Sequence, residues 1–190
     1  MKRDEFAQSV SAYLARFPDE QAALSDLSRQ LREDETDMLS RANMRGHLTA
    51  SAFVLNAERN AVLFIHHKAH NMWLQPGGHY EAPGDLWDTA RREVAEETGI
   101  QDIALHEWHH QHAIPFDIDT HHVPARPAKN EGDHVHHDVM YIAVAGSNAA
   151  GELQASEITG LRWVPLAELA TMPGLRLARF LPKLKREGIL

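Results

Sequence analysis

The sequence contains no cysteine, and this absence excludes several kinds of site at once. Without thiols there are no disulfides, no thiolate zinc sites and no cysteine nucleophile. No apolar run approaches the length of a transmembrane helix. The first ten residues lack the apolar stretch of a secretory signal. We therefore expect a cytoplasmic protein with no membrane partner.

Basic residues are also few, with 19 Lys and Arg against 27 Asp and Glu, which gives a formal net charge of -8. A nucleic-acid partner is not expected, because nucleic-acid binders usually carry a basic face. No HExxH pattern occurs, so zinc peptidase chemistry has no support. This charge balance still permits a small phosphorylated substrate that is held through a cation.

At 190 residues, the chain has room for one domain, or for one domain with an appendage. Residues 1–43 read as helical, because large apolar side chains recur at offsets of three and four. These are Phe6, Val10, Leu14 and Phe17. The pattern changes to strands near Gly46. We therefore predict a helical extension over residues 1–45 and a main domain over residues 46–190.

The main domain alternates strand patterns with helix patterns. Strands are expected at 47–56, 61–67, 72–75, 103–112, 135–145 and 161–164, and helices at 86–98 and 175–187. Asp85 can cap the first helix with Asp88 three residues on, and Gly99 can end it. The histidine-rich stretch 107–112 reads as an exposed edge strand. A loop longer than about 15 residues follows it, and loops of that length are usually functional or disordered.

Three glutamates lie within five positions of the helix expected at 86–98. Offsets of three and four place Glu93, Glu96 and Glu97 on one face, where like charges repel by a few tenths of a kcal/mol per pair. A solvated helix face is one interpretation. The other is a cation site, since clustered carboxylates suit Mg²⁺ or Mn²⁺.

The wider segment GGHYEAPGDLWDTARREVAEETGI resembles the signature of the Nudix hydrolase family. Eight of its nine defined positions agree, at Gly78, Arg92, Glu93, Val94, Glu96, Glu97, Gly99 and Ile100. The ninth departs, because Gly84 stands where the family has glutamate. In the family that glutamate commonly pairs with the arginine, and here Asp85 or Asp88 is predicted to hold Arg92 instead. The resemblance extends over about residues 46–170.

The resemblance implies a fold, a reaction and a set of roles. The fold is an α/β/α sandwich around a mixed sheet. The reaction is hydrolysis of a diphosphate linkage, in a nucleoside diphosphate linked to a group X or in a related phosphorylated metabolite. Glu93, Glu96 and Glu97 would bind one to three divalent ions, Mg²⁺ or Mn²⁺, with the Gly78 carbonyl as a further ligand. Arg92 would orient a glutamate, and a metal-activated water would attack phosphorus.

Outside this signature, several polar residues are predicted to bind substrate. Strand alternation over 134–141 places His136 and Asp138 on one face. Asp138 would bind a metal or orient water, and His136 would contact a phosphate and give activity a pH limb between about 5 and 8. Asp119 and His121, in the long loop, would belong to a substrate lid. His79 would touch substrate. A polar strand end and ordinary loop residues are the structural alternatives.

The sequence is also compatible with two rival functions. The chain can be a Nudix-fold module that senses a ligand without turnover, an interpretation that Gly84 keeps open. It can also be an interaction protein whose helices at residues 1–45 bind a partner. A homodimer formed through those helices is compatible with either rival and with the small-molecule diphosphatase.

Overall fold

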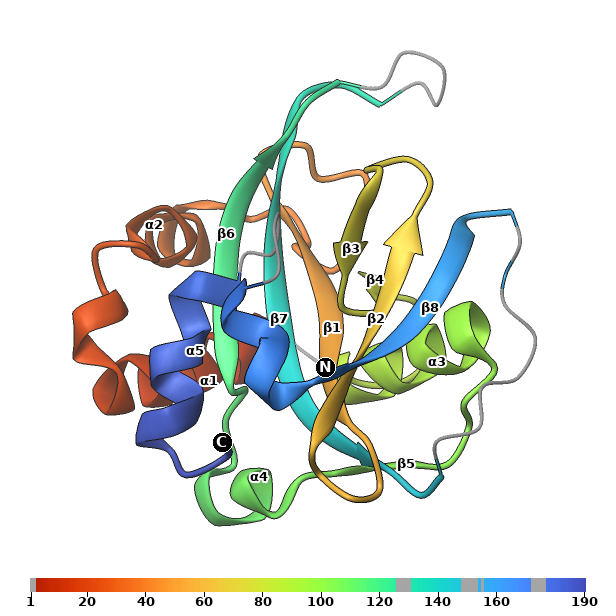
Figure 1. Cartoon of the computed structure of the whole chain (residues 1–190). Coiled ribbons are helices and arrows are strands. Elements are labelled where there is room, and N and C mark those ends of the chain that lie inside the picture. Colours follow the sequence, from red (N-terminus) through yellow and green to blue (C-terminus); the bar gives the residue numbers. More distant parts are fainter. Residues whose placement is uncertain (1–2, 126–130, 148–153, 155, 172–176) are drawn as a thin grey trace. The chain divides into compact units, whose positions relative to one another are not determined.

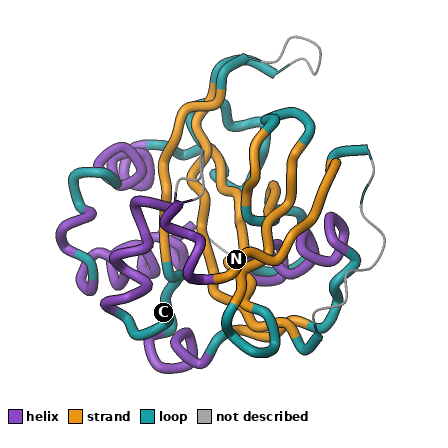
Figure 2. Tube along the Cα trace, in the orientation of Figure 1, coloured by secondary structure: helices purple, strands orange, loops and turns teal. Residues whose placement is uncertain are grey.

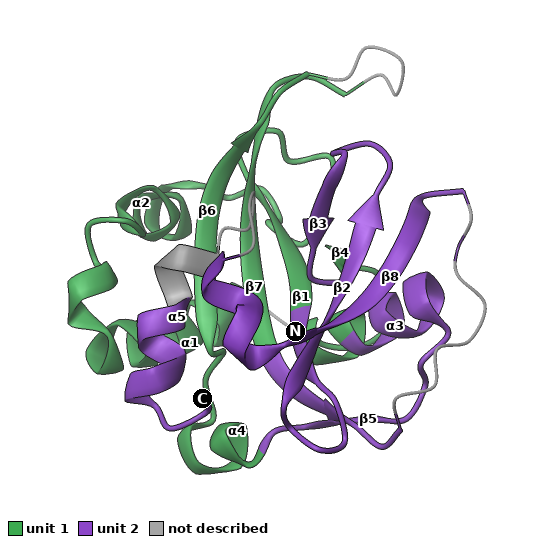
Figure 3. Cartoon of the chain, in the orientation of Figure 1, with its two compact units in different colours: residues 1–51, 77–90, 107–141 green, residues 52–76, 91–106, 142–190 purple. Residues whose placement is uncertain are grey.

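A computed structural model of the chain describes residues 3–125, 131–147, 154, 156–171 and 177–190. The chain divides into two compact units, shown in different colours in Figure 3. Unit 1 comprises residues 1–51, 77–90 and 107–141, and unit 2 comprises residues 52–76, 91–106 and 142–190.

Unit 1 contains the N-terminal helices and a long β-hairpin (Figure 1). Its elements are α1 (Arg3–Arg16), η1 (Pro18–Glu20), α2 (Ser25–Glu33), the start of β1 (His47–Leu55), β4 (Gly77–His79), the start of α3 (Leu86–Thr98), α4 (Glu107–His112), β6 (Asp117–Val123) and most of β7 (His134–Ala145). Phe6, Val10 and Tyr13 form the buried stripe of α1, as their helical spacing predicts.

Unit 2 contains the remaining strands and the acidic end of α3. Its elements include β2 (Ala61–His67), β3 (Met72–Leu74), β5 (Ile103–Leu105), β8 (Ile158–Pro165), η3 (Leu166–Thr171) and α5 (Leu177–Arg186). β2 pairs antiparallel with β8 from Ala61↔Pro165 to His67↔Ile158. The turn between β1 and β2 is closed by Asn56, whose Oδ1 accepts hydrogen bonds from the backbone N–H groups of Asn60 and Ala61 at 2.8 and 3.0 Å.

The strands follow the hydrogen-bonded order β3-β2-β1-β7-β5, with β4 on β1, β6 on β7 and β8 on β2. Figure 2 shows the strands in orange and the helices in purple. The predicted α/β class with a large mixed sheet is confirmed, and β1, β2, β3 and α3 lie where their patterns predict them. Among the described residues, no helix combines the length and the apolarity needed to cross a bilayer.

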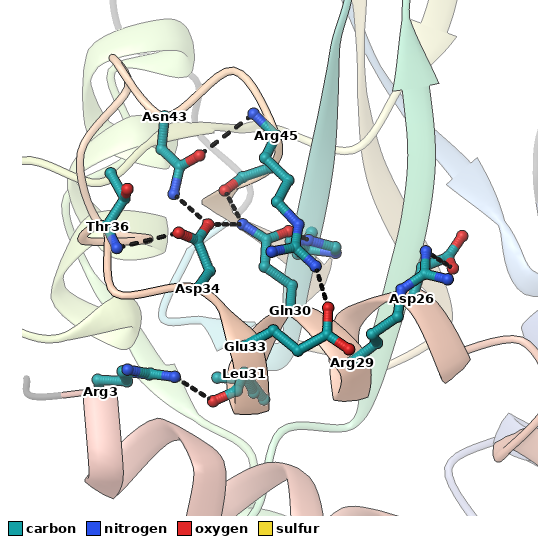
Figure 4. Close-up of polar contacts among 12 residues, drawn as sticks. Arg3, Asp26, Arg29, Gln30, Leu31, Glu33, Asp34, Thr36, Asn43 and Arg45 are labelled. Carbon is teal, nitrogen blue, oxygen red and sulfur yellow. Dashed lines mark hydrogen bonds and ion pairs between the residues drawn. The ribbon is translucent and has the colours of Figure 1, made fainter.

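The helical prediction for residues 1–43 is wrong after Glu33, where α2 ends. The carboxylate of Asp34 organises the segment that follows (Figure 4). It accepts hydrogen bonds from the Thr36 backbone N–H at 3.0 Å and from the side-chain amides of Gln30 and Asn43, both at 3.1 Å. These bonds, the backbone one first, lower the pKa of Asp34 to about 2. Such local side-chain bonds compete with helix and favour turns.

The strand prediction for 103–112 is wrong after Leu105, because residues 107–112 form α4. Strand alternation would put Trp108 and His109 on opposite faces, whereas in α4 both are buried. Trp108 contacts the rings of Phe17 and Phe116 at centroid distances of 6.5 and 5.1 Å. Burial of this indole outweighs the local alternation of polar residues.

The predicted long loop is shorter than expected, because Asp117–Val123 forms β6. β6 pairs antiparallel with β7, from Asp117↔Met140 to Val123↔His134. The lid predicted around Asp119 and His121 is therefore a strand. β4 was not predicted either, because Gly77 and Gly78 read as a turn.

Candidate functional site

The N-terminus of α3 is fixed by the reciprocal hydrogen bonds that its sequence predicts. The Asp88 backbone N–H donates to Asp85 Oδ1 at 2.9 Å, and the Asp85 N–H donates to Asp88 Oδ2 at 3.0 Å. Leu86, Ala90 and Val94 are at most 1% exposed, at spacings of four residues. This buried stripe fixes the rotation of the helix about its axis.

The charged face of α3 carries Arg92 and the three glutamates in unit 2. The Arg92 guanidinium donates to Glu93 Oε1 at 2.8 Å, and its Nε lies 3.5 Å from Glu96 Oε1. Glu96 is exposed and Glu93 is partly buried, whereas Glu97 is only 3% exposed. Arg92 thus offsets the repulsion between Glu93 and Glu96, and both carboxylates converge on one positive group.

Carboxylate oxygens are the donors that Mg²⁺ and Mn²⁺ prefer. Glu93 and Glu96 supply such oxygens, and both carboxylates contact Arg92. Glu97 adds a third carboxylate, which the fold keeps buried. The end of the helix is fixed as predicted by Gly99, whose φ of 71° is a left-handed conformation suited to a helix C-terminus.

Gly84 departs from the Nudix signature for a visible backbone reason. Its φ is 132°, and a Cβ at this position would lie 2.9 Å from both Cβ and Oδ2 of Asp88. L side chains rarely adopt this conformation. Asp85 and Asp88 cap the helix here, and the prediction that one of them also holds Arg92 stays a prediction.

We therefore expect Gly84→Glu, which completes the signature, to destabilise the protein. The positive φ and the contact with Asp88 should cost at least about 1 kcal/mol. Chemical denaturation checks this, with Glu81→Gln, an exposed change three residues away, as the control. Unchanged or raised stability in Gly84→Glu would contradict the proposed backbone constraint.

The Pro-Gly-Gly segment forms an edge against β1 in unit 1. Thr49 pairs with His79, Ala50 with Gly78 and Ser51 with Gly77. A Cβ on Gly77 would lie 2.7 Å from the Ala50 carbonyl oxygen and 2.6 Å from Ser51 Cβ. Glycine is therefore required for this close approach of two backbones.

On the face of β7 predicted to bind substrate, the side chains contact side chains of β1 and β4. Asp138 accepts hydrogen bonds from Thr49 Oγ1 at 2.8 Å and from Ser51 Oγ at 2.6 Å. Burial raises the pKa of Asp138. The alternation is confirmed, because His136 contacts the rings of His47 and His79. His137 lies on the other face, where its Nε2 is 3.1 Å from Gln30 Oε1.

The strand β6 brings two further predicted residues beside β7. Asp119 pairs with Asp138 and His121 with His136 in the register of the hairpin. The His121 Nδ1 lies 2.9 Å from Asp119 Oδ2, and the His121 ring lies 5.6 Å from that of His136. Asp119, His121, His136 and Asp138 are therefore neighbours in unit 1.

The expected pH limb from His136 between about 5 and 8 is wrong. Burial, followed by the like charges of neighbouring imidazoles, lowers the pKa of His136 to about 2. The ring is therefore neutral throughout that range. A role in which a charged His136 binds a phosphate or donates a proton near neutral pH loses its basis.

The structure also shows polar residues that the sequence reasoning missed. His47, Thr49 and Ser51 alternate along β1, with every residue of this strand buried. Polar residues at every second position of an otherwise apolar strand indicate that one face of the strand is polar, and this pattern is visible in the sequence. It matches the row of His134, His136 and Asp138 on β7.

The predicted site residues fall in both units. Unit 1 contains Gly78, His79, Asp119, His121, His136 and Asp138, and unit 2 contains Arg92, Glu93, Glu96 and Glu97. Their joint action stays a prediction.

Comparison with known families identifies the class of protein. The NUDIX domain model matches residues 45–184, so the chain belongs to the Nudix family. A relative from Arabidopsis thaliana, Nudix hydrolase 6, is 26% identical over 140 residues. That alignment covers 70% of this chain, and the chain spans only 44% of the plant protein.

Solved structures show the same fold. A hydrolase of the NUDIX family from Clostridium perfringens has a TM-score of 0.55 at 18% identity, over 77% of this chain and 98% of that one. The NUDIX domain of Shewanella oneidensis NrtR, solved with ADP ribose, has a TM-score of 0.53 at 21% identity, over 86% and 98%. At these identities the likeness establishes the fold alone.

Proposed function

We propose that this protein is a hydrolase that depends on Mg²⁺ or Mn²⁺ and cleaves a diphosphate linkage in a nucleoside diphosphate-X compound or a related phosphorylated metabolite. The observation that carries the proposal is the charged face of α3, where Arg92 gathers Glu93 and Glu96 beside the buried Glu97. Family membership and the name of the plant relative support the same reaction class.

The proposal gives each residue of this face a role. Glu93, Glu96 and Glu97 would hold the divalent ion. When bound, such an ion polarises phosphoryl oxygens and lowers the pKa of a coordinated water. Arg92, at 2.8 Å from Glu93, would keep that carboxylate in one rotamer. Because Val94 and Ala90 anchor the opposite face of α3 in the core, the carboxylates are presented by a rigid element, which reduces the cost of ordering them.

We also propose that residues of unit 1 bind the substrate. The carbonyl of Gly78 would add an oxygen ligand, as the family resemblance implies. His79, Asp119, His121, His136 and Asp138 would line the binding site. Two hydroxyls hold the Asp138 carboxylate in one orientation, and this carboxylate would bind a metal or orient water.

The direct test is a screen for phosphate-containing products with purified protein and Mg²⁺ or Mn²⁺. The panel contains nucleotide sugars, dinucleoside polyphosphates, NADH, ADP-ribose and nucleoside triphosphates. We expect turnover of at least one diphosphate-linked compound, abolished by a chelator and strongly reduced in Glu97→Gln. No turnover with any member under either metal would count against the proposal.

A second candidate function is a Nudix-fold module that binds its ligand without turnover. Gly84 favours it, since the backbone at this position cannot take the usual glutamate without strain. The NrtR domain was solved with ADP ribose, so that compound is the first ligand to examine. Isothermal titration beside the activity assay separates the two functions, because the module would bind without consuming its ligand.

Divalent ions should stabilise the folded chain if the carboxylate face binds them. An ion present at about ten times its Kd adds about 1.4 kcal/mol, which for a chain of this size raises Tm by about 3–6 °C. We expect Mg²⁺ or Mn²⁺ to produce this shift in a thermal melt and Glu97→Gln to reduce it. Glu157→Gln, an exposed change in unit 2, is the matched control. A melt that is indifferent to both ions would favour the solvated helix face.

We also propose domain boundaries, a cellular location and an oligomeric state for this protein. We assign residues 46–190 to the Nudix domain and residues 1–45 to a helical extension, in a cytoplasmic enzyme, and the extension is the part through which a homodimer would form. Light scattering of the purified chain tests the dimer, and a monomer at micromolar concentration would rule it out.

A further inference from the structure

Three strands of unit 1 bring three imidazoles together. His47 is the first residue of β1, His79 is the last residue of β4, and His136 lies near the start of β7. One ring nitrogen from each lies within 4.8 Å of the others. The ring centroids are 5.2 Å apart for His47 and His79, 4.8 Å for His47 and His136, and 5.0 Å for His79 and His136.

His47 has a ring nitrogen that lacks a hydrogen-bond partner. The side chain is 1% exposed, and its Nδ1 lies 3.0 Å from the Asn43 carbonyl oxygen. Because a carbonyl can only accept, Nδ1 carries the proton and Nε2 carries the lone pair. That Nε2 is fully buried and makes no hydrogen bond. Metal-binding histidines are commonly oriented by this kind of bond from the other nitrogen to a backbone carbonyl.

A similar chain of bonds sets the lone pair of His136. The His134 Nδ1 lies 2.7 Å from the Gly132 carbonyl oxygen, so it is the donor, and in the singly protonated tautomer that this bond selects Nε2 accepts. His136 Nε2 lies 3.0 Å from that nitrogen and must donate to it. The remaining nitrogen of His136, Nδ1, therefore carries a lone pair.

The charge state of these rings favours a cationic ligand. Burial is the main cause that lowers the pKa of His47, that of His79 to about 4 and that of His136 to about 2. A lowered pKa favours the uncharged imidazole, which is the form that binds metal ions. An anion such as phosphate would need the protonated rings, which burial disfavours.

We infer that His47, His79 and His136 form a binding site for one transition-metal cation of the class that prefers imidazole, represented by Zn²⁺. Three histidines with an open fourth position are a known zinc arrangement. Nitrogens bound at about 2.0–2.1 Å to a tetrahedral ion are about 3.3 Å apart, so small side-chain rotations close the site from its present spacing. Softer nitrogen ligands distinguish this site from the oxygen ligands of α3, and the inference does not depend on the proposed hydrolysis.

The test uses the whole chain without a polyhistidine tag, stripped of metal by a chelator and then dialysed. Co²⁺ is titrated in the presence of excess Mg²⁺, and its visible d–d absorption reports binding. Zn²⁺ is then added to displace it. We expect saturation at one ion per chain and loss of the absorption on adding Zn²⁺.

Two ligand variants and one control locate the ion. His79→Asn and His136→Asn should each weaken Co²⁺ binding by at least about 100-fold, the upper end of what loss of a mere supporting group costs. His122→Asn is the control, because its side chain is 61% exposed on β6. Circular dichroism of the metal-free variants separates lost ligation from lost structure. Binding that survives in both ligand variants, or that disappears in Glu96→Gln instead, would overturn the inference.

A measurement on the unmodified protein makes the result independent of variant folding. Crystals grown with Zn²⁺ are examined by anomalous diffraction at the zinc edge. An anomalous peak bounded by the three imidazoles is expected. Absence of this peak, or peaks at other positions only, would show that the three histidine rings pack against one another without binding a metal ion.

Discussion

Glu97→Gln is expected to lower kcat by at least about 100-fold, since loss of one group that stabilises transition-state charge costs about that much. Glutamine keeps the shape of the side chain but removes the negative charge. Glu97 is 3% exposed, so the change removes a charge that the fold keeps buried. The measurement is steady-state turnover of the compound found in the screen, at saturating Mg²⁺.

Glu96→Gln sharpens this test, because Glu96 is exposed and its change should leave the fold intact. Its kcat should fall to a similar extent if it holds the ion, whereas a solvated helix face predicts no effect. Glu157→Gln serves as the control for a change of one charge in unit 2. Near-wild-type turnover in both Glu96→Gln and Glu97→Gln would remove the basis for metal-dependent hydrolysis at this face.

The elements that local patterns predict correctly are those in which backbone and side-chain signals agree. Two β-rich segments separated by a turn-like stretch predict β1 and β2, and the exchange between Asp85 and Asp88 predicts the start of α3. The predictions failed where a tertiary contact outweighed the local pattern. Trp108 turns an apparent edge strand into α4. The pairing of β6 along β7 makes a strand from a segment with few strand signals.

The two candidate sites differ in how far the sequence reveals them. The residues of the α3 face lie within one helical segment, so spacing alone brings Arg92, Glu93 and Glu96 together. His47, His79 and His136 come from three strands that are distant in sequence. Only the register Thr49↔His79 and the placement of β7 beside β1 make them neighbours. No periodicity in a single segment contains that information.

The two candidate sites also differ in the metal ions that their ligand atoms favour. Hard carboxylate oxygens on α3 suit Mg²⁺ or Mn²⁺, whereas neutral imidazoles suit ions that bind nitrogen. After chelation, each metal ion should therefore be added back separately and activity measured with each. Activity restored by Mg²⁺ alone would assign catalysis to the carboxylates and leave the histidine cluster with a separate role.

Phe17→Ala is expected to destabilise the protein by about 3–5 kcal/mol, the usual cost of deleting a fully buried phenylalanine. Phe17 is 0% exposed. Its ring lies 5.0 Å from that of Tyr13 and 6.5 Å from that of Trp108. Tyr13 in turn contacts Glu20 and lies 3.3 Å from Asp117 Oδ1, at the start of β6. The N-terminal helices therefore complete the core of unit 1.

Equilibrium unfolding in urea measures this loss, with Gln8→Ala as the control, because Gln8 is exposed on α1 and surface changes usually stay within about 0.5 kcal/mol. If residues 1–45 were a separate appendage, Phe17→Ala would melt the helices without moving the main transition. If they belong to the core of unit 1, the single transition shifts as a whole. A change below about 1 kcal/mol, at the centre of what ordinary single substitutions cost, would refute the structural role assigned to Phe17.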